Sequence, residues 1–200
     1  MNPLYVALLH HPVLDRNKAV ITSSVTNMDL HDIARSCRTF GVRRYFVVHP
    51  SPDEQALNRR ILSHWASGYG ERSHPTRKDA LSFVELVTSF DQVLQAISEE
   101  CGQKPFCVGT SARREGPKHI GEGELLESLK DRPALLVFGT GYGLTSQWHS
   151  TLEAYLAGIE GEGSDFNHLS VRSAVAIYLD RLFGRRRRDF EGANTLTKAS

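Results

Sequence analysis

Residues 135–145 read Leu-Leu-Val-Phe-Gly-Thr-Gly-Tyr-Gly-Leu-Thr, and this stretch decides the fold. An apolar run rich in strand formers gives way to glycine at every second position, which is typical of a buried strand that ends in a tight loop. Glycine permits positive φ and lets a ligand approach the backbone closely. Because ligands of open α/β sheets bind beyond the carboxyl ends of the strands, this loop is a candidate cofactor site.

Length and composition favour one compact domain. The chain has 200 residues, 40% of them hydrophobic, and a formal net charge of +1, and a chain of this size can bury a sizeable core. No apolar run reaches the roughly 18 residues of a membrane span, and residues 1–15 lack the basic start and cleavage site of a signal peptide. Three cysteines without CxxC spacing favour a reduced, cytoplasmic protein, and the histidines form no HxH or HxxxH cluster, so we expect no metal.

Strand-like and helix-like segments alternate along the chain. We expect strands at residues 4–9, 44–49, 83–88, 105–109, 135–138 and 152–159. We expect helices at about 29–40, 52–67, 91–100, 122–129 and 169–182. This alternation predicts an α/β fold, a parallel sheet with helices on both faces. In the second helix, the residues predicted to face inward are Ala56, Leu57, Ile61 and Trp65.

The glycine pattern alone leaves the ligand open. A dinucleotide is disfavoured because the full GxGxxG is absent, residue 144 being leucine, and because that motif normally opens the first βαβ unit. A P-loop is excluded, since neither GKS nor GKT follows. A second glycine-rich loop at residues 160–164 could wrap the same small molecule from its other side.

Three segments, one of which holds the glycine loop, must be considered together. Residues 26–42 read Thr-Asn-Met-Asp-Leu-His-Asp-Ile-Ala-Arg-Ser-Cys-Arg-Thr-Phe-Gly-Val, residues 136–144 hold the glycine loop, and residues 167–177 read Asn-His-Leu-Ser-Val-Arg-Ser-Ala-Val-Ala-Ile. In this order and spacing they resemble the three motifs of the SPOUT superfamily of S-adenosylmethionine-dependent RNA methyltransferases. The resemblance covers about residues 4–184. It is closest to a bacterial subgroup that occurs alone or fused to the tRNA guanine-N1 methyltransferase.

The resemblance implies a Rossmann-like core with a C-terminal deep trefoil knot, in a domain of residues 1–184 followed by a basic, mobile tail of residues 185–200. It implies S-adenosylmethionine as cofactor, RNA (tRNA favoured) as substrate, and a homodimer with the site at the subunit interface. The cofactor-binding residues that we expect are Gly109, Thr110, Phe138, Gly139, Thr140, Gly141, Gly143, Ile159, Gly161, His168 and Leu169.

Arg35 matches the arginine of the first motif and is the leading catalytic candidate, because a guanidinium can bind phosphate or stabilise charge that develops on a ribose 2′-oxygen. Asn27 would orient the hydroxyl. Ser170 matches a serine of the third motif, and helix capping is an equal alternative for it. The expected RNA-binding residues are Arg38, Arg172, Arg185, Arg186 and Arg187.

Departures from the family limit what can be carried over. Where ribose-methylating members often have Ser-Leu-Asn, this chain has Phe166, Asn167 and His168. Asp29 and Asp32 are expected to serve the N-terminus of their helix, where negative charge is favourable. The favoured function is 2′-O-ribose methylation of RNA. Methylation of a base nitrogen, a non-catalytic RNA-binding module on the same fold and a dinucleotide oxidoreductase are the alternatives.

Overall fold

The computed structural model describes residues 1–67, 74–113, 116, 118–163 and 166–185. Seven strands form one sheet, in the order β5-β4-β1-β8-β6-β9-β7, and every pairing in it is parallel. Their bounds are β1 Leu4–Leu9, β4 Tyr45–Val48, β5 Val84–Val87, β6 Phe106–Thr110, β7 His119–Ile120, β8 Ala134–Gly139 and β9 Ala154–Leu156. The predicted parallel α/β sheet is therefore confirmed.

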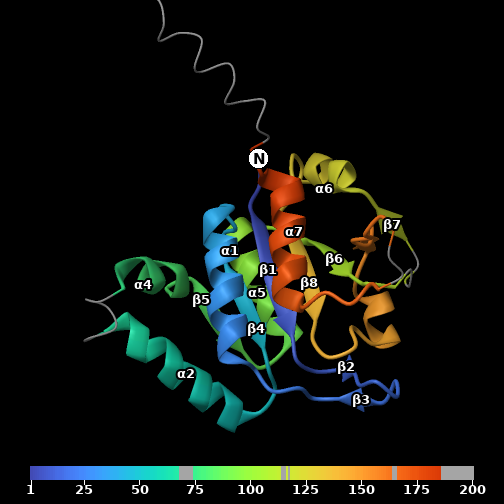
Figure 1. Cartoon of the computed structure of the whole chain (residues 1–200). Coiled ribbons are helices and arrows are strands. Elements are labelled where there is room, and N and C mark those ends of the chain that lie inside the picture. The colour runs from blue at the N-terminus through green and yellow to red at the C-terminus, as the bar shows by residue number, and fades with distance from the viewer. Residues whose placement is uncertain (68–73, 114–115, 117, 164–165, 186–200) are drawn as a thin grey trace, which may run out of the picture.

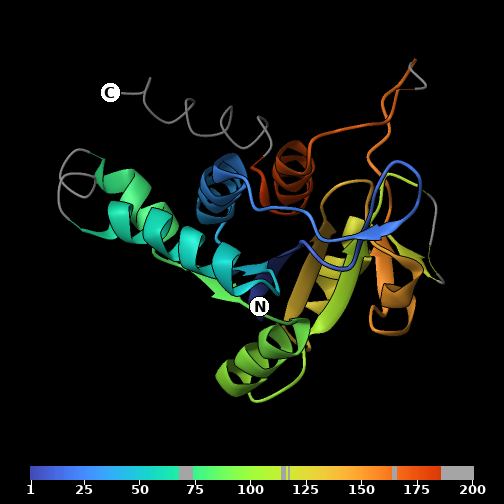
Figure 2. The ribbon, with the colours of Figure 1, turned by 90° about the horizontal axis from the view of Figure 1, so that it is seen from below.

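Helices cover both faces of this sheet (Figures 1 and 2). Their bounds are η1 Asp29–Ile33, α1 Ala34–Thr39, α2 Pro52–Ala66, α4 Pro75–Leu81, α5 Phe90–Cys101, α6 Glu122–Ser128, η2 Ser146–Ser150 and α7 Val171–Phe183. Figure 2 shows α1 and α7 side by side over one face and α5 beneath the other. Outside the main sheet, β2 (Val13–Leu14) and β3 (Val20–Ile21) form a short antiparallel ribbon.

The interior strand β1 is apolar throughout because both of its faces are buried. Leu4, Val6 and Leu8 pack in the core that contains α1 and α7, while the three alternate residues pack in the core that contains α5. Successive side chains of a strand point to opposite faces, so a strand buried on both faces needs a continuous apolar run. That requirement made the strands predictable.

The second helix differs from its prediction. Of the four residues expected to face inward, two are partly buried against the core, Ile61 and Trp65, and two are exposed, Ala56 and Leu57. The helix instead buries polar residues, among them Gln55, whose side chain is 2% exposed. The prediction for Ala56 and Leu57 was wrong because the first part of α2 meets the ends of β4 and β5, where Gln55 bonds backbone carbonyls, and only its later residues reach the apolar core.

Several short elements were not predicted, namely β2, β3, β7, α4 and η2. Residues 68–73, between α2 and α4, lie outside the described residues, as does nearly all of the expected tail at 185–200. Within the described ranges, no helix has the length and apolarity to cross a membrane. The same part of the chain contains no group of three or more metal-ligating side chains.

Candidate active site

A cavity of about 540 Å³ opens beyond the carboxyl ends of β6 and β8. Its wall comes from the segment before η1, the loops after β6 and β8, the stretch after β9 and the start of α7. The volume lies within the range of about 300–1,000 Å³ that is usual for small-molecule sites. Nine of the eleven expected cofactor-binding residues line it: Thr110, Phe138, Gly139, Thr140, Gly141, Gly143, Ile159, His168 and Leu169.

The glycine loop is tightly packed against the ribbon strand β2. The Tyr142 amide donates to the Leu14 carbonyl at 2.8 Å, and the Leu14 amide donates to the Gly143 carbonyl at 3.0 Å. A Cβ on Gly141, whose φ is +60°, would lie 2.6 Å from the Leu14 oxygen, and a Cβ on Gly139 would lie 2.8 Å from the Leu144 nitrogen. Both glycines are therefore required by the packing of the loop itself.

The two other predicted glycines lie outside the cavity. A Cβ on Gly109 would meet the ring of Tyr155 at 2.7 Å and the side chain of Leu152 at 2.8 Å, so this glycine makes room for the core on the α5 side of the sheet. Gly161 is exposed, and a Cβ there would meet nothing within 4 Å. Neither position lines the site.

A chain of hydrogen bonds fixes the floor of the cavity. The Thr140 hydroxyl donates to the Leu9 carbonyl at 3.1 Å and also contacts the Ser23 hydroxyl. Ser23 in turn lies 3.2 Å from Nδ1 of His10. Burial, and secondarily the neighbouring His49, lowers the pKa of His10 to about 4, so this histidine is neutral at pH 7.

The loops around the cavity are tied to one another by side chains that the sequence did not single out. Asn167 donates from Nδ2 to the Ala112 carbonyl at 3.0 Å, and Arg113 donates from Nη2 to the Tyr142 carbonyl at 2.9 Å. The His168 ring lies 5.7 Å from the Tyr142 ring. These contacts connect the third motif, the loop after β6 and the glycine loop. Asn167 was detectable only as a neighbour of His168 in the third motif.

Apolar side chains form the remaining wall. Phe138, Ile159 and Leu169 line the cavity together with Val171 and Tyr178 of α7. Flat apolar surfaces beside backbone polar groups are what an aromatic base requires, since its faces need packing and its edge needs hydrogen bonds. The cavity therefore has the chemistry of a nucleoside site.

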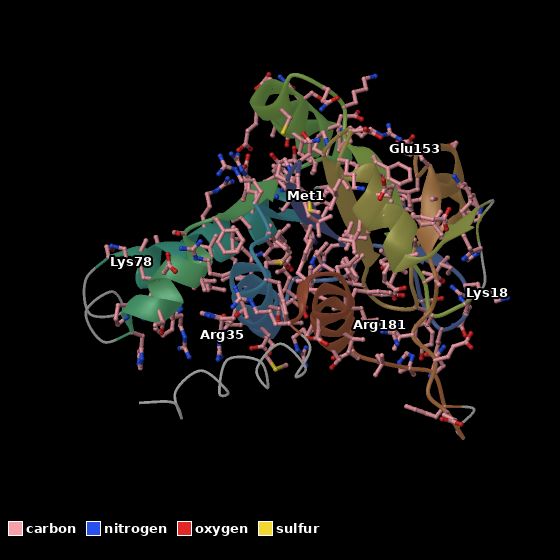
Figure 3. The ribbon with its side chains drawn as sticks, turned by 90° about the horizontal axis from the view of Figure 1, so that it is seen from above. Met1, Lys18, Arg35, Lys78, Glu153 and Arg181 are labelled. Carbon is pink, nitrogen blue, oxygen red and sulfur yellow. The ribbon has the colours of Figure 1, made fainter. Side chains whose placement is uncertain are left out.

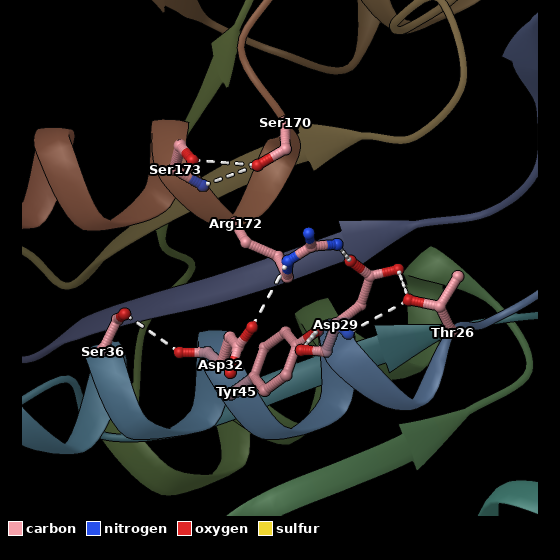
Figure 4. A network of polar contacts seen from close by, with 8 residues as sticks. All are labelled: Thr26, Asp29, Asp32, Ser36, Tyr45, Ser170, Arg172 and Ser173. Atoms are coloured by element: carbon pink, nitrogen blue, oxygen red, sulfur yellow. Dashed lines mark hydrogen bonds and ion pairs between the residues drawn. The ribbon is translucent and has the colours of Figure 1, made fainter.

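Asp29 brings a carboxylate to this cavity. It lines the wall, is 5% exposed and accepts a hydrogen bond of 2.6 Å from the Thr26 hydroxyl (Figure 4). Its position at the start of η1 agrees with the expected helix role, but that role did not indicate a place in the site. Asn27, which was expected to be catalytic, is exposed and lies outside the cavity.

Arg172 and Ser170 both have partners within the chain. Arg172 lies on α7, with Nη1 3.5 Å from an oxygen of Asp29 and Nε 3.4 Å from an oxygen of Asp32 (Figure 4). The Ser170 hydroxyl accepts a 3.2 Å hydrogen bond from the Ser173 amide and so caps α7, while the residue also lines the cavity. The two roles expected for Ser170 are thus compatible in space.

Arg35 lies outside the cavity, exposed on the surface of α1 (Figure 3). It lines a second depression of about 370 Å³ between α1 and α4, together with Arg38, His74, Arg77 and four further residues. Arg38 makes two hydrogen bonds to Asp79, of 2.8 and 3.1 Å. Of the other expected RNA-binding residues, Arg185 is exposed and Arg186 and Arg187 lie outside the described residues.

Comparison with known proteins identifies the family. Residues 3–184 match the family model described as SAM-dependent RNA methyltransferase. A protein of Aquifex aeolicus with no characterised function is 40% identical over 93% of this chain and 91% of its own length. A tRNA (guanine-N(1)-)-methyltransferase of Nitratidesulfovibrio vulgaris is 40% identical over 90% of this chain, but the match spans only 42% of that enzyme.

A solved structure supports the fold assignment. The SpoU methyltransferase AviRb of Streptomyces viridochromogenes, determined in complex with AdoMet, superposes with a TM-score of 0.51 at 18% identity, over 92% of this chain and 60% of that one. The family match spans nearly the whole described chain, and the glycine loop and the cavity at the strand ends are consistent with it. The chain thus belongs to the family of SAM-dependent RNA methyltransferases, and it shares the fold of the SpoU methyltransferase AviRb.

Proposed function

We propose that the cavity binds S-adenosylmethionine and that the protein methylates tRNA on a ribose 2′-oxygen. The cofactor supplies an activated methyl group. The observation that carries the proposal is the cavity itself, where the glycine loop, apolar walls and a buried carboxylate meet. Phe138, Ile159 and Leu169 would pack the adenine, and the backbone of residues 139–143 would read its edge.

The proposed division of labour places RNA at the surface beside Arg35. Arg35, Arg38 and Arg77 line the second depression, and Asp79, the one carboxylate among its described lining residues, is already paired with Arg38. An excess of guanidinium groups suits the phosphate backbone. In this scheme Arg35 polarises the 2′-hydroxyl, Asn27 orients it, and exposed Arg185 adds a phosphate contact, as would Arg186 and Arg187. Because Arg172 already faces two carboxylates, its phosphate contact would require exchange of partners.

The position of Arg35 outside its own cavity favours action on the cofactor of a second subunit. Apolar side chains at the surface, Met28 at 56%, Phe166 at 78% and Leu169 at 44% exposure, provide area for such a homodimer near the cavity. We expect Arg35→Ala to lose methyl transfer while keeping cofactor affinity. Mixing this variant with a cavity variant such as Gly141→Val should restore part of the activity, because the mixed dimer keeps one complete site; no recovery would refute action in trans.

We further propose that the C-terminal segment is knotted. After β9, which pairs with β6 and β7, the chain returns to α7, which packs against η1 and α1 on the other side of β8. Asn167 holds the returning segment against the loop after β6. An experimental electron-density map that traces residues 140–183 would test the threading.

The ribose assignment is tested by nucleoside mass spectrometry of tRNA from a deletion strain. Loss of a 2′-O-methylated nucleoside is expected, in the cytoplasmic tRNA pool. Loss of a base-methylated nucleoside would instead favour base-nitrogen chemistry, which the guanine-N1 methyltransferase named above makes the principal alternative. Calorimetry tests the enzyme assignment separately: salt-sensitive RNA binding without any affinity for S-adenosylmethionine would indicate a non-catalytic RNA-binding module.

A further inference from the structure

We propose that the carboxylate of Asp29 recognises the sulfonium charge of the methyl donor and so distinguishes the loaded cofactor from its demethylated product. The inference rests on the proposed cofactor site. S-adenosylmethionine carries a cationic sulfur, whereas S-adenosylhomocysteine carries a neutral thioether. The two molecules share the adenosine and the amino acid and differ by one methyl group and this charge, so a fixed carboxylate beside the sulfur favours the charged donor.

The charge distribution around the cavity singles out Asp29. Among the described residues that line it, Asp29 is the only carboxylate. The other ionisable groups there are Arg113, on the loop after β6, together with Tyr142, His168 and Tyr178. The Arg113 guanidinium donates to the Tyr142 carbonyl, so it is held at the glycine loop. A cationic ligand atom therefore has one anionic partner available in this wall.

The carboxylate is also held in place. Asp29 is 5% exposed, its Oδ2 accepts from the Thr26 hydroxyl at 2.6 Å, and its backbone carbonyl accepts from the Tyr45 hydroxyl at 3.4 Å. A charge that is fixed in a site shielded from water acts on a ligand more strongly than the same charge in bulk water. Asp29 therefore needs little rearrangement to face a cation in the cavity.

Arg172 does not neutralise this surface completely. A single guanidinium lies between two carboxylates, at 3.5 Å from Asp29 and 3.4 Å from Asp32, so the three groups together carry one negative charge. Neither contact is short or bidentate, and Arg172 remains 29% exposed. The sulfonium would complete the balance of charge, and its conversion to a thioether would remove that attraction and favour release of the product.

Calorimetry with the full chain tests the inference, using S-adenosylmethionine, S-adenosylhomocysteine and 5′-methylthioadenosine. For Asp29→Asn we expect an about ten-fold or greater loss of affinity for S-adenosylmethionine, as for removal of a close charge pair, and little change for the two thioethers. The matched control is Asp91→Asn, which removes an exposed carboxylate on α5, outside the cavity and on the face of the sheet opposite Arg172, and should leave the ratio of the two affinities nearly unchanged.

A second variant guards against failure of Asp29→Asn to fold. Arg172→Gln removes the competing cation, so the preference for S-adenosylmethionine over S-adenosylhomocysteine should rise several-fold. Equal losses for both amino-acid-bearing ligands in Asp29→Asn, with methylthioadenosine unaffected, would assign Asp29 to the ammonium group and overturn the inference, as would an unchanged ratio in both variants. If the wild-type protein binds none of the three ligands, the proposed cofactor site itself fails.

Discussion

The hydroxyl of Tyr178 donates a 3.0 Å hydrogen bond to the backbone carbonyl of Ala157. The bond joins the middle of α7 to the segment just after β9, and Tyr178 also lines the cavity. Burial raises the pKa of Tyr178 to about 12, so the hydroxyl keeps its proton at neutral pH. A single side chain thus supports both the packing of the last helix and the shape of the site.

Replacement of Tyr178 by phenylalanine should remove this bond and leave the ring in place. We expect the free energy of unfolding to fall by about 1 kcal/mol, because the Ala157 carbonyl loses its donor, and cofactor affinity to weaken. Urea unfolding and calorimetry measure the two effects. Tyr142→Phe, at a side chain that is 52% exposed, is the control for stability and should change it by less than about 0.5 kcal/mol.

Substitutions on the buried polar face and on the exposed face of α2 should differ in their effect on stability. Gln55 donates from Nε2 to the carbonyls of His49 at 2.9 Å and Val87 at 2.7 Å, beside the ends of β4 and β5. Gln55→Leu should cost about 1–3 kcal/mol because the His49 carbonyl loses its donor and the Val87 carbonyl keeps only the His49 amide. Leu57→Gln, on the exposed side of the same helix, should be nearly neutral. Chemical denaturation would contradict this account if the leucine variant proved the more stable of the two.

The glycine loop should tolerate no side chain at Gly139. A methyl group there would lie 2.8 Å from the Leu144 nitrogen, which is backbone and cannot rotate away. We expect Gly139→Ala to destabilise the protein by about 1–3 kcal/mol and to abolish measurable cofactor binding. Gly123→Ala, in α6 with open space around the new methyl group, should instead stabilise the fold by about 0.5–1 kcal/mol. Thermal unfolding of both variants makes the comparison.

His10 should make the protein sensitive to mild acid. Its folded pKa of about 4 lies below the unfolded value of 6.5, so the unfolded chain takes up the proton first as the pH falls. Stability is therefore fully present above pH 6.5 and decreases toward pH 4, by up to about 3 kcal/mol for this group. His10→Gln should flatten that part of the pH dependence. Identical slopes for the two proteins in urea titrations between pH 7 and pH 4 would show that His10 is not responsible.

The sequence was informative wherever burial dictates composition. β1 and β8 lie in the interior of the sheet. Both of their faces are buried, and that burial requires their continuous apolar runs. α4 was missed for the opposite reason: only Ala80 and Leu81 of its residues are buried, so no periodic apolar stripe exists to detect. Two-residue strands such as β7 likewise carry no repeating pattern.

The lining of the cavity was predictable along the glycine loop, where backbone conformation restricts the residue type, and in the third motif through its resemblance to the family. Asp29 escaped prediction because an acidic residue in the first turn of a helix already has a sufficient electrostatic explanation. Its second role depends on how η1 turns toward the start of α7, about 140 residues later in the chain, as the contact with Arg172 shows. Local sequence does not encode such a meeting, and the same applies to Asn167 and Ala112.

The wall of the cavity has a consequence for the order of events during synthesis. It begins near Ser23 and ends at Tyr178, so it closes only when α7 has packed onto the sheet. A chain still emerging from the ribosome can build most of the sheet but cannot hold the cofactor. Ligand that binds only the completed fold stabilises that fold and no earlier stage, so the cofactor would act as a check that the last helix is in place.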